Sequence, residues 1–329
     1  MLENFQAHQI GKNDDGQRCT LTELSDSDLM DGDVTVRVDY TTLNYKDGLA
    51  LTGRSPIIRH FPLTPGIDFS GSVIESSHPD FAAGDEVILN GFGVGEAHSG
   101  GYAQKARVSG DWLVPVPEGL DTRRAMAIGT AGYTAMLCVL ALEGHGIKPD
   151  AGDILVTGAA GGVGSIAVAV LGKLGYRVVA STGRPQEADF LRHLGAADIV
   201  ERASFAEKAR PLARETWAGA IDVAGGNTLA NVLSQVKRDG AVAICGLAES
   251  MNLPTSVAPF ILRGIAMYGI DSVMAPIARR KLAWQRLASD LDLALLDELS
   301  FDLDFADLPQ AASDILDGKI RGRAVVKVP

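Results

Sequence analysis

The sequence predicts an α/β protein in which a doubly wound parallel sheet is joined to a second, barrel-like β domain. From about residue 150, short apolar runs alternate with longer segments of helical periodicity. The first 124 residues instead contain short alternating runs punctuated by Gly, Pro and Thr. A chain of 329 residues, 46% of them hydrophobic, is long enough to bury two such cores.

The parallel sheet is predicted from six apolar runs in the middle of the chain. They read ILVTG, YRVVAS, ADIVE, AGAIDVAG, GAVAICG and IAMYGIDS. Helices are expected between them over 163–174, 187–194 and 229–236. Strands this apolar are buried on both faces when helices connect them. We therefore expect a doubly wound domain over residues 125–273.

The second domain is predicted from both ends of the chain. Runs such as DVTVRVDY and GSVIES, separated by frequent turn signals, indicate a compact, twisted, barrel-like β domain over residues 1–124. An amphipathic helix is expected over 277–287, and an apolar strand over 324–328. We expect this last strand to return to the first domain, so that residues 274–329 belong with 1–124.

Composition disfavours several classes of partner and location. Thirty basic and 41 acidic side chains give a formal charge of −11, which disfavours nucleic acid and anionic membrane surfaces. No basic segment followed by an apolar one begins the sequence, so we expect a cytoplasmic protein. The uncharged runs over 125–142 and 154–172 approach the length of a membrane span, but their glycines and polar residues indicate packed interior segments.

A Gly-rich segment, VTGAAGGVGS, follows the first apolar strand and opens a predicted helix. Backbone N–H groups and the positive end of a helix dipole in this context hold a pyrophosphate, and small residues let it approach. The sequence therefore predicts dinucleotide binding rather than an ordinary tight turn. The residues that we expect to contact the cofactor here are Ala159, Ala160, Gly161, Gly162, Val163 and Gly164.

The end of the second strand indicates which dinucleotide binds. An NAD site usually offers an acidic residue there for the ribose 2′-hydroxyl. This chain instead has Ser181, Thr182, Gly183 and Arg184. Two hydroxyls and a guanidinium suit a 2′-phosphate, although Arg184 is also compatible with a solvated loop residue. We interpret the segment as selective for NADPH.

Longer strings carry a resemblance to a known family over the whole chain. They are LNYKDGLALTG, PGIDFSG, GDWLVP, GTAGYTAMLC, WAGAIDVAG, PFILRG and GIDSV. In order, they resemble the acrylyl-CoA reductase (NADPH) branch of the quinone-oxidoreductase-like enzymes, within the medium-chain dehydrogenase/reductase superfamily. The resemblance implies a Rossmann domain with a discontinuous GroES-like β-barrel domain. It also implies a zinc-free enzyme, usually a homodimer, that reduces acryloyl-CoA to propanoyl-CoA.

The residues themselves argue against a catalytic metal. Zinc alcohol dehydrogenases of the superfamily carry a His-Glu pair after Pro-Gly, whereas here Pro65-Gly66 is followed by Ile67 and Asp68. The six histidines show no paired ligand spacing, and three cysteines are too few for a four-cysteine lobe. We expect no bound metal and an internal hydrogen bond for Asp68. Conjugate hydride addition to an activated alkene remains feasible without a Lewis acid.

Candidate catalytic residues are predicted in the first domain. Hydride addition to the β-carbon of an enoyl thioester puts negative charge on the thioester oxygen, which hydrogen-bond donors must meet. The resemblance implies that the segment around Tyr45 lies in the cleft and that Tyr45 contacts the cofactor. Its phenol is either a donor or packed over the nicotinamide. Lys46 and Asp47 are interpreted as a turn or helix-start contact. Asn90 either orients substrate or nicotinamide, or caps a loop.

The C-terminal half supplies the remaining candidates. The resemblance implies that Leu247 and Ser272 border the cofactor. Arg323, and with less support Arg321, is a candidate for the phosphates of CoA or NADPH, the alternative being an ordinary surface arginine. Cys138 is interpreted as core packing. The segment AMYGIDSV resembles an edge strand through which related enzymes form dimers.

Two other functions remain open from the sequence alone. One is a quinone or 2-alkenal reductase of broad specificity, which needs no site for CoA phosphates. The other is an NADPH-binding regulatory protein with little turnover, whose sequence would show a damaged cleft. The proton donor to the α-carbon is not identified, because a side chain, a water molecule or the cofactor ribose can serve.

Overall fold

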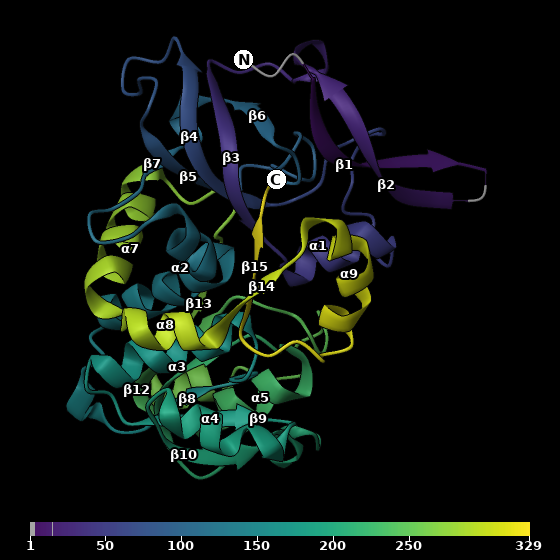
Figure 1. Cartoon of the computed structure of the whole chain (residues 1–329). Coiled ribbons are helices and arrows are strands. Elements are labelled where there is room, and N and C mark those ends of the chain that lie inside the picture. The colour runs from purple at the N-terminus through teal and green to yellow at the C-terminus, as the bar shows by residue number, and fades with distance from the viewer. Residues whose placement is uncertain (1–3, 15) are drawn as a thin grey trace. The chain divides into compact units, whose positions relative to one another are not determined.

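The computed structural model describes residues 4–14 and 16–329, and the chain divides into two compact units (Figure 1). Unit 1 consists of Met1–Thr130, Ser272–Ala288 and Leu296–Pro329. Unit 2 consists of Ala131–Asp271 and Ser289–Leu295. Each unit is described separately below.

Unit 2 contains the predicted parallel sheet. Its six strands lie in the order β10-β9-β8-β11-β12-β13, and every neighbouring pair is parallel. This confirms the doubly wound prediction, because the strand order reverses between β8 and β11. The strands are β8 (Ile154–Val156), β9 (Val178–Thr182), β10 (Ala196–Glu201), β11 (Trp217–Asp222), β12 (Val236–Ile244) and β13 (Ala266–Gly269).

Helices connect these strands. Because crossovers between parallel strands are right-handed as a rule, we expect α3 and α4 on one face of the sheet and α5 and α6 on the other. Apolar side chains from β8, β9, β11, β12 and α5 form a continuous core, which includes Trp217 of β11 and which Phe205 joins. The helices are α3 (Gly162–Lys173), α4 (Ala188–His193), α5 (Gly226–Gln235) and α6 (Ala258–Arg263).

One predicted boundary is wrong. The expected helix over 229–236 ends at Gln235, and Val236 begins β12, where it pairs with Trp217 of β11. The apolar residues at 229, 232, 233 and 236 fit helical spacing, so the period alone does not mark the end. Val236 has extended dihedral angles, with φ −66° and ψ 136°, because it pairs with strand β11 instead of continuing the helix.

Unit 1 is built on a seven-stranded mixed sheet and a separate hairpin of β1 and β2. Strand β15 pairs with β3, so the C-terminal strand returns to the N-terminal sheet as expected. The strands are β1 (Asn4–Asn13), β2 (Gly16–Ser25), β3 (Val34–Thr42), β4 (Asp68–Ser76), β5 (Glu86–Asn90), β6 (Lys105–Val108), β7 (Val114–Pro115), β14 (Ser300–Leu303) and β15 (Arg323–Lys327). Its helices include α1 (Tyr45–Thr52), α7 (Ile277–Asp290), α8 (Leu293–Leu299) and α9 (Leu308–Leu316), of which the ends of α7 and α8 extend into unit 2.

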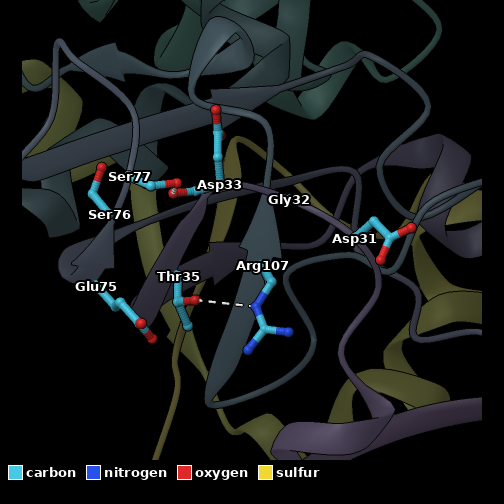
Figure 2. Close-up of a pocket in the computed structure, with 8 residues that line it drawn as sticks. All are labelled: Asp31, Gly32, Asp33, Thr35, Glu75, Ser76, Ser77 and Arg107. Carbon is cyan, nitrogen blue, oxygen red and sulfur yellow. Dashed lines mark hydrogen bonds between the residues drawn. The ribbon is translucent and has the colours of Figure 1, made fainter.

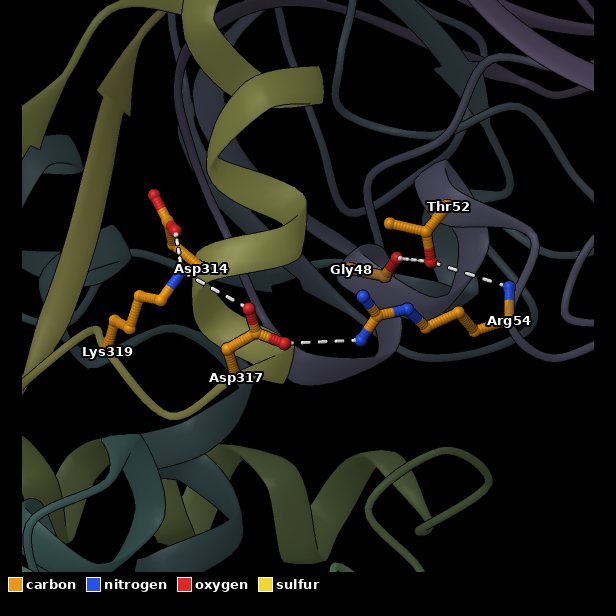
Figure 3. Close-up of polar contacts among 6 residues, drawn as sticks. All are labelled: Gly48, Thr52, Arg54, Asp314, Asp317 and Lys319. Atoms are coloured by element: carbon orange, nitrogen blue, oxygen red, sulfur yellow. Dashed lines mark hydrogen bonds and ion pairs between the residues drawn. The ribbon is translucent and has the colours of Figure 1, made fainter.

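Helix α1 packs closely on α9. A Cβ at Gly48 would lie 2.8 Å from Cγ2 of Ile315, so the glycine permits the approach. Figure 3 shows a chain of ion pairs at the surface beside this contact. Arg54 meets Asp317 at 3.4 Å, and Lys319 meets both Asp317 and Asp314. Exposed pairs of this kind contribute little, so the close packing holds the two helices together.

Helix α2 (Thr122–His145) is broken at Gly129, where φ is 52° and ψ is −162°. Within the described ranges it is the one helix long and apolar enough to cross a membrane by length and composition. That evidence is weak, because residues such as Met126 and Cys138 are buried inside the protein. The core-packing interpretation of Cys138 is confirmed.

Candidate active site

The Gly-rich turn lies between β8 and α3, as predicted. Gly158 has a φ of +57°, a conformation that favours glycine. A Cβ at Gly164 would lie 2.4 Å from the carbonyl oxygen of Gly158, so only glycine fits there. In the described chain no side chain caps α3 at Gly161. The N–H groups and the positive dipole end of this helix are therefore suited to an anion.

The end of β9 lies beside this turn. The backbone N–H of Ala159 donates to the carbonyl of Ser181 at 3.0 Å. Nη2 of Arg184 donates to the carbonyl of Ala160 at 3.0 Å, and its backbone N–H donates to Oγ1 of Thr182. The Ser181 hydroxyl is buried and has no hydrogen-bond partner among the described residues. A buried hydroxyl in this state indicates a place for a bound polar group.

A second arginine, which sequence reasoning missed, also lies at this place. Arg202 directly follows β10, the neighbour of β9, and Glu201 pairs in register with Thr182. A Cβ at Gly183 would lie 2.7 Å from Cζ of Arg202, so that guanidinium lies against Gly183. The sequence signal that could have revealed Arg202 is a basic residue immediately after the third strand of the parallel sheet. In this fold the third strand lies beside the second, so a residue at its end comes close to the end of the second strand.

Buried hydrogen bonds between Thr157 and Asp222 hold together the loops at the carboxyl ends of β8 and β11. Oγ1 of Thr157 donates to Asp222 at 2.7 Å and accepts from the N–H of Val223 at 3.0 Å. The other carboxylate oxygen of Asp222 accepts from the N–H groups of Ala224 and Gly225. Burial raises the pKa of Asp222, against the effect of these donors. Sequence reasoning missed this residue, because its partners are brought together by strand pairing.

The carboxyl ends of β12 and β13 form a shallow hollow of about 400 Å³ in unit 2. Its lining residues include Cys245, Gly246, Leu247 and Asp271. The side chain of Leu247 is 56% exposed, which is unusual for leucine and leaves an apolar surface available to a ligand. Open α/β sheets bind ligands at this edge.

In unit 1, Asn44 and Asp47 begin helix α1. Oδ2 of Asp47 accepts from the backbone N–H of Asn44 at 2.9 Å, and Oδ1 accepts from the N–H of Ile67 at 3.0 Å. The helix-start interpretation of Asp47 is therefore confirmed, while Lys46 pairs with Glu96 at 2.8 Å. Burial and the charge of Asp68 raise the pKa of Asp47 to about 7.

Tyr45 is the first residue of α1, and 45% of its surface is exposed. The capping contacts of Asn44 and Asp47 on either side fix its backbone. An exposed phenol on a fixed helix start is available to a ligand. Its role as a donor or as a packing surface stays a prediction.

Asp68 makes the expected internal hydrogen bonds. Its carboxylate accepts from Oγ1 of Thr42 at 2.8 Å, from Nδ2 of Asn44 at 3.0 Å and from the N–H of Thr130 at 2.7 Å. These donors use the oxygens that would otherwise bind a cation. Among the residues described here, no three His, Cys, Asp or Glu side chains stand together as metal ligands.

Arg323 is 2% exposed, so the surface-arginine alternative is wrong. Its Nε donates to the carbonyl of Ala127 at 3.0 Å, and Nη1 donates to Oδ1 of Asn44 at 3.3 Å. Nη2 has no hydrogen-bond partner in the described part of the chain and lies against Gly129. Strand β15 turns the side chain inward, where Asp68 and Asp47 balance its charge. A role at phosphates stays a prediction. We refer to Asn44, Asp47, Asp68 and Arg323 as the buried polar network.

Asn90 ends strand β5 and is 2% exposed. Its Nδ2 donates to Oγ1 of Thr130 at 3.2 Å, and its Oδ1 accepts from Nε1 of Trp284 at 3.2 Å. Because an indole only donates, the amide orientation is fixed with its oxygen toward Trp284. The structure thus places Asn90 in a defined position next to Thr130, and its catalytic role stays a prediction.

Another hollow, which lies in unit 1, is not lined by any predicted site residue. Figure 2 shows this cavity of about 290 Å³, which is lined largely by acidic and hydroxyl side chains. Nε of Arg107 donates to Oγ1 of Thr35 at 3.3 Å, and Asp33 accepts from the N–H of Gly110. The polar groups of Arg107 and Asp33 in this cavity hydrogen-bond to neighbouring residues of the chain, so we do not assign a ligand to the cavity.

Two family models match the chain. A model described as alcohol dehydrogenase GroES-like domain matches residues 30–118, and one described as zinc-binding dehydrogenase matches residues 162–289. The predicted combination of a GroES-like β domain with a Rossmann sheet is confirmed.

Similar proteins cover nearly the whole chain. The acrylyl-CoA reductase AcuI of Ruegeria pomeroyi is 52% identical over 98% of this chain and 99% of its own length. The YhdH oxidoreductase of Salmonella enterica, solved in complex with NADP, has 52% identity and a TM-score of 0.97 over 98% of this chain and 100% of its own. The YhfP protein of Bacillus subtilis, solved with NAD bound, has 44% identity and a TM-score of 0.95 over 98% and 99%.

Proposed function

The chain belongs to the acrylyl-CoA reductase family of the medium-chain dehydrogenase/reductase superfamily, and on that premise we propose that it reduces acryloyl-CoA to propanoyl-CoA with NADPH. The observation that carries the proposal is the full-length similarity to a reductase of that activity. The reaction is hydride addition to the β-carbon of the enoyl thioester, followed by protonation of the α-carbon. The enzyme needs no metal for this step.

The residues present fit NADPH. We assign the pyrophosphate to the turn from Ala159 to Gly164, whose helix N-terminus is uncapped and whose last glycine leaves no space for a side chain. The 2′-phosphate is assigned to Ser181, Thr182, Gly183 and Arg184, joined by Arg202. The buried, unpartnered hydroxyl of Ser181 and the two guanidiniums support this assignment. Leu247, Ser272 and Tyr45 are proposed to contact the cofactor, as the family resemblance implies.

The domain roles follow from these assignments. Residues 125–273 are proposed as the NADP-binding domain, and residues 1–124 with 274–329 as the catalytic domain. NADPH supplies the hydride when bound. Tyr45 and Asn90 are proposed to donate hydrogen bonds to the thioester oxygen as negative charge develops there. Asn90 has a fixed amide orientation, and preorganised donors of this kind require little rearrangement during the reaction.

Arg323 is proposed to act from inside the catalytic domain. Its Nη2 is a buried donor without a partner among the described residues, which supports contact with a bound anionic oxygen of substrate or cofactor. The neighbouring Gly129 carries no side chain that would shield Nη2. The nearby carboxylate of Asp68 offsets the charge of this guanidinium.

The protein is further proposed to act in the cytoplasm as a homodimer that does not bind nucleic acid or membranes. Strand β13 is the edge of the six-stranded sheet, and Met267 and Tyr268 on it are each 37% exposed. Ile261 of the adjacent helix α6 is 73% exposed. A second copy would cover this apolar edge. The charge of −11 supports the absence of polyanionic partners.

The decisive experiment measures NADPH oxidation by the purified, chelator-treated protein with acryloyl-CoA. NADH in place of NADPH, and acrolein or a small quinone in place of acryloyl-CoA, are run in parallel. We expect rapid turnover that is selective for NADPH and for the CoA thioester and that survives chelation. Turnover with acrolein or quinones alone would support the broad-specificity reductase instead. Tight NADPH binding without any turnover would support the regulatory protein.

A further inference from the structure

Helix α7 carries an arginine on its buried face. Arg280, Ala283, Trp284 and Leu287 are its buried residues, at the spacing of one helical stripe. Arg280 and Trp284 are each 1% exposed, although α7 is otherwise an ordinary amphipathic helix. A guanidinium is expensive to bury, so its hydrogen-bond partners show what it holds in place.

The guanidinium of Arg280 binds two loops that are distant in sequence. Nη1 donates to the carbonyl of Asn90 at 2.6 Å. Nη2 donates to the carbonyls of Ser272 at 3.0 Å and Val273 at 2.6 Å, and Nε donates to that of Ala275 at 2.9 Å. One planar group with five fixed donors therefore sets the spacing between the end of β5 and the segment before α7.

The backbone around these contacts leaves little room for adjustment. Phe92 has a φ of +52°, and the centroid of its ring lies 4.0 Å from Cζ of Arg280. Its N–H donates to the carbonyl of Val273 at 3.0 Å. A Cβ at Gly91 would lie 2.6 Å from that same oxygen. The two loops thus touch through their backbones on one side of the guanidinium.

Asn90 is held a second time from the same helix. Trp284 lies one turn after Arg280, and its Nε1 donates to the side-chain oxygen of Asn90 at 3.2 Å. Arg280 therefore fixes the backbone of Asn90, while Trp284 fixes its amide. If Asn90 only filled space in the core, it would not need hydrogen bonds to both its backbone and its side chain.

We infer that Arg280 is a positioning residue for the reduction, which sets the Asn90 amide and the Ser272–Val273 segment at a fixed distance from each other. The inference rests on the proposed function, in which Asn90 meets the thioester oxygen and Ser272 borders the cofactor. Arg280 does not itself touch substrate or cofactor. Its loss therefore affects turnover through Asn90 and cofactor affinity through Ser272 at the same time.

The test compares Arg280→Lys with Arg279→Lys, its exposed neighbour on α7. A lysine keeps the charge, but its single nitrogen cannot span the four carbonyls. For Arg280→Lys we expect kcat per folded molecule to fall on the order of 10- to 100-fold, since small displacements of reacting groups have effects of that size. The KM for NADPH is expected to rise by about 10-fold, the size of effect that lost hydrogen bonds to a charged group produce. Arg279→Lys is expected to match the wild type in both.

Trp284→Phe separates the positioning of Asn90 from the positioning of the Ser272–Val273 segment. It removes the indole donor to Asn90 and leaves Ser272 and Val273 bound to Arg280. We therefore expect it to lower kcat and leave the KM for NADPH unchanged. Folded protein is quantified for each variant by its thermal transition, and NADPH affinity is also measured by cofactor fluorescence without substrate.

Each outcome decides the inference. It is overturned if Arg280→Lys loses activity only in proportion to folded protein, or if either kcat or the KM for NADPH matches that of Arg279→Lys. The fluorescence titration distinguishes failure of this inference from failure of the proposed function, because it measures NADPH binding without substrate. If the wild type does not reduce acryloyl-CoA but Arg280→Lys still weakens NADPH binding, the function fails and the positioning of the Ser272 segment stands. Unchanged NADPH binding in that case overturns both.

Discussion

The Gly-rich turn of unit 2 and the buried polar network of unit 1 are both predicted to serve the reaction, but they are built differently. The turn uses backbone N–H groups and a helix dipole, within residues that are neighbours in sequence. The network uses side chains from α1, β4 and β15, which meet only in the folded unit. Backbone-built sites depend on the absence of side chains, and side-chain networks depend on the presence of every member.

This difference predicts how each region responds to substitution. Adding one methyl group at Gly164 is expected to weaken cofactor binding at the turn strongly, because a Cβ there has no space. In the network, removing or moving one member is expected to change stability and its pH dependence. The four predictions below run from the largest expected effect to the smallest.

Gly164→Ala is expected to lower NADPH affinity on the order of 100-fold, because the new Cβ would meet the Gly158 carbonyl at 2.4 Å and displace the helix start from the phosphate. Isothermal titration with NADPH measures the change. Gly144→Ala is the control, since Gly144 is an exposed helical glycine with nothing within 4 Å of a Cβ. Equal affinities for the two variants would contradict the assignment of the turn.

Gly129→Ala is expected to lower the free energy of unfolding by about 2 kcal/mol, because φ is +52° and the new Cβ would meet Nη2 of Arg323 at 2.4 Å. Urea unfolding measures it. Gly53→Ala also has a positive φ, of 67°, but its nearest neighbour is 3.6 Å away, so its loss should be smaller. If both variants lost the same amount, backbone strain alone would explain the effect.

Arg184→Ala and Arg202→Ala are each expected to lower the preference for NADPH over NADH by about 10-fold, since each removes a charged donor for the 2′-phosphate. The ratio of kcat/KM with the two cofactors measures this preference. Arg192→Ala, which removes an exposed arginine paired with Asp189 on α4, should leave the ratio unchanged. An unchanged ratio for Arg184→Ala would refute the assignment of Arg184 to the 2′-phosphate.

Asp47→Asn is expected to flatten the pH dependence of stability. The pKa of Asp47 is raised to about 7, so between about pH 4 and 7 the folded protein holds a proton that the unfolded chain releases. The free energy of unfolding from this group therefore falls as pH rises through that window, by at most about 1.4 kcal/mol per pH unit. Urea unfolding across the window should show a smaller slope for Asp47→Asn than for wild type.

The exposed substitution Asp80→Asn serves as the control for that slope and should retain the wild-type value. Because Asp47 also begins helix α1, we expect Asp47→Asn to be less stable at every pH, which does not affect the test. The slope, and not the absolute stability, reports the proton. An identical slope in all three proteins would show that Asp47 does not titrate in this range.

Much of unit 2 could be predicted from sequence, because its signals are local. Alternating strands and helices, the Gly-rich turn and the missing acidic residue after β9 each lie within a few neighbouring positions. Arg202 was missed, since its place beside Gly183 depends on the lateral order of β9 and β10. Val236 was placed in a helix because its spacing fits either structure, and pairing with Trp217 decided it.

Unit 1 was less predictable at the level of the site. Asp68 was expected to make an internal hydrogen bond, because no zinc-ligand histidine precedes it. Arg323 was considered for the surface or for a phosphate, and the structure turns it inward. Arg280 gave no signal, because an arginine on an amphipathic helix is usually assigned to the exposed face.

The sequence by itself determined the class of fold, the Gly-rich turn and the choice of cofactor. Apolar periodicity, small residues and the residue types at the end of one strand are all local signals that act over a few positions of the chain. Only the tertiary structure decided the partners of the buried charges. Asn90 and Arg280 are 190 positions apart, and Asn44 and Arg323 are 279 apart. A buried charge is stable only with its hydrogen bonds satisfied, and the groups that satisfy these two come from strands and loops that the folded sheet brings together.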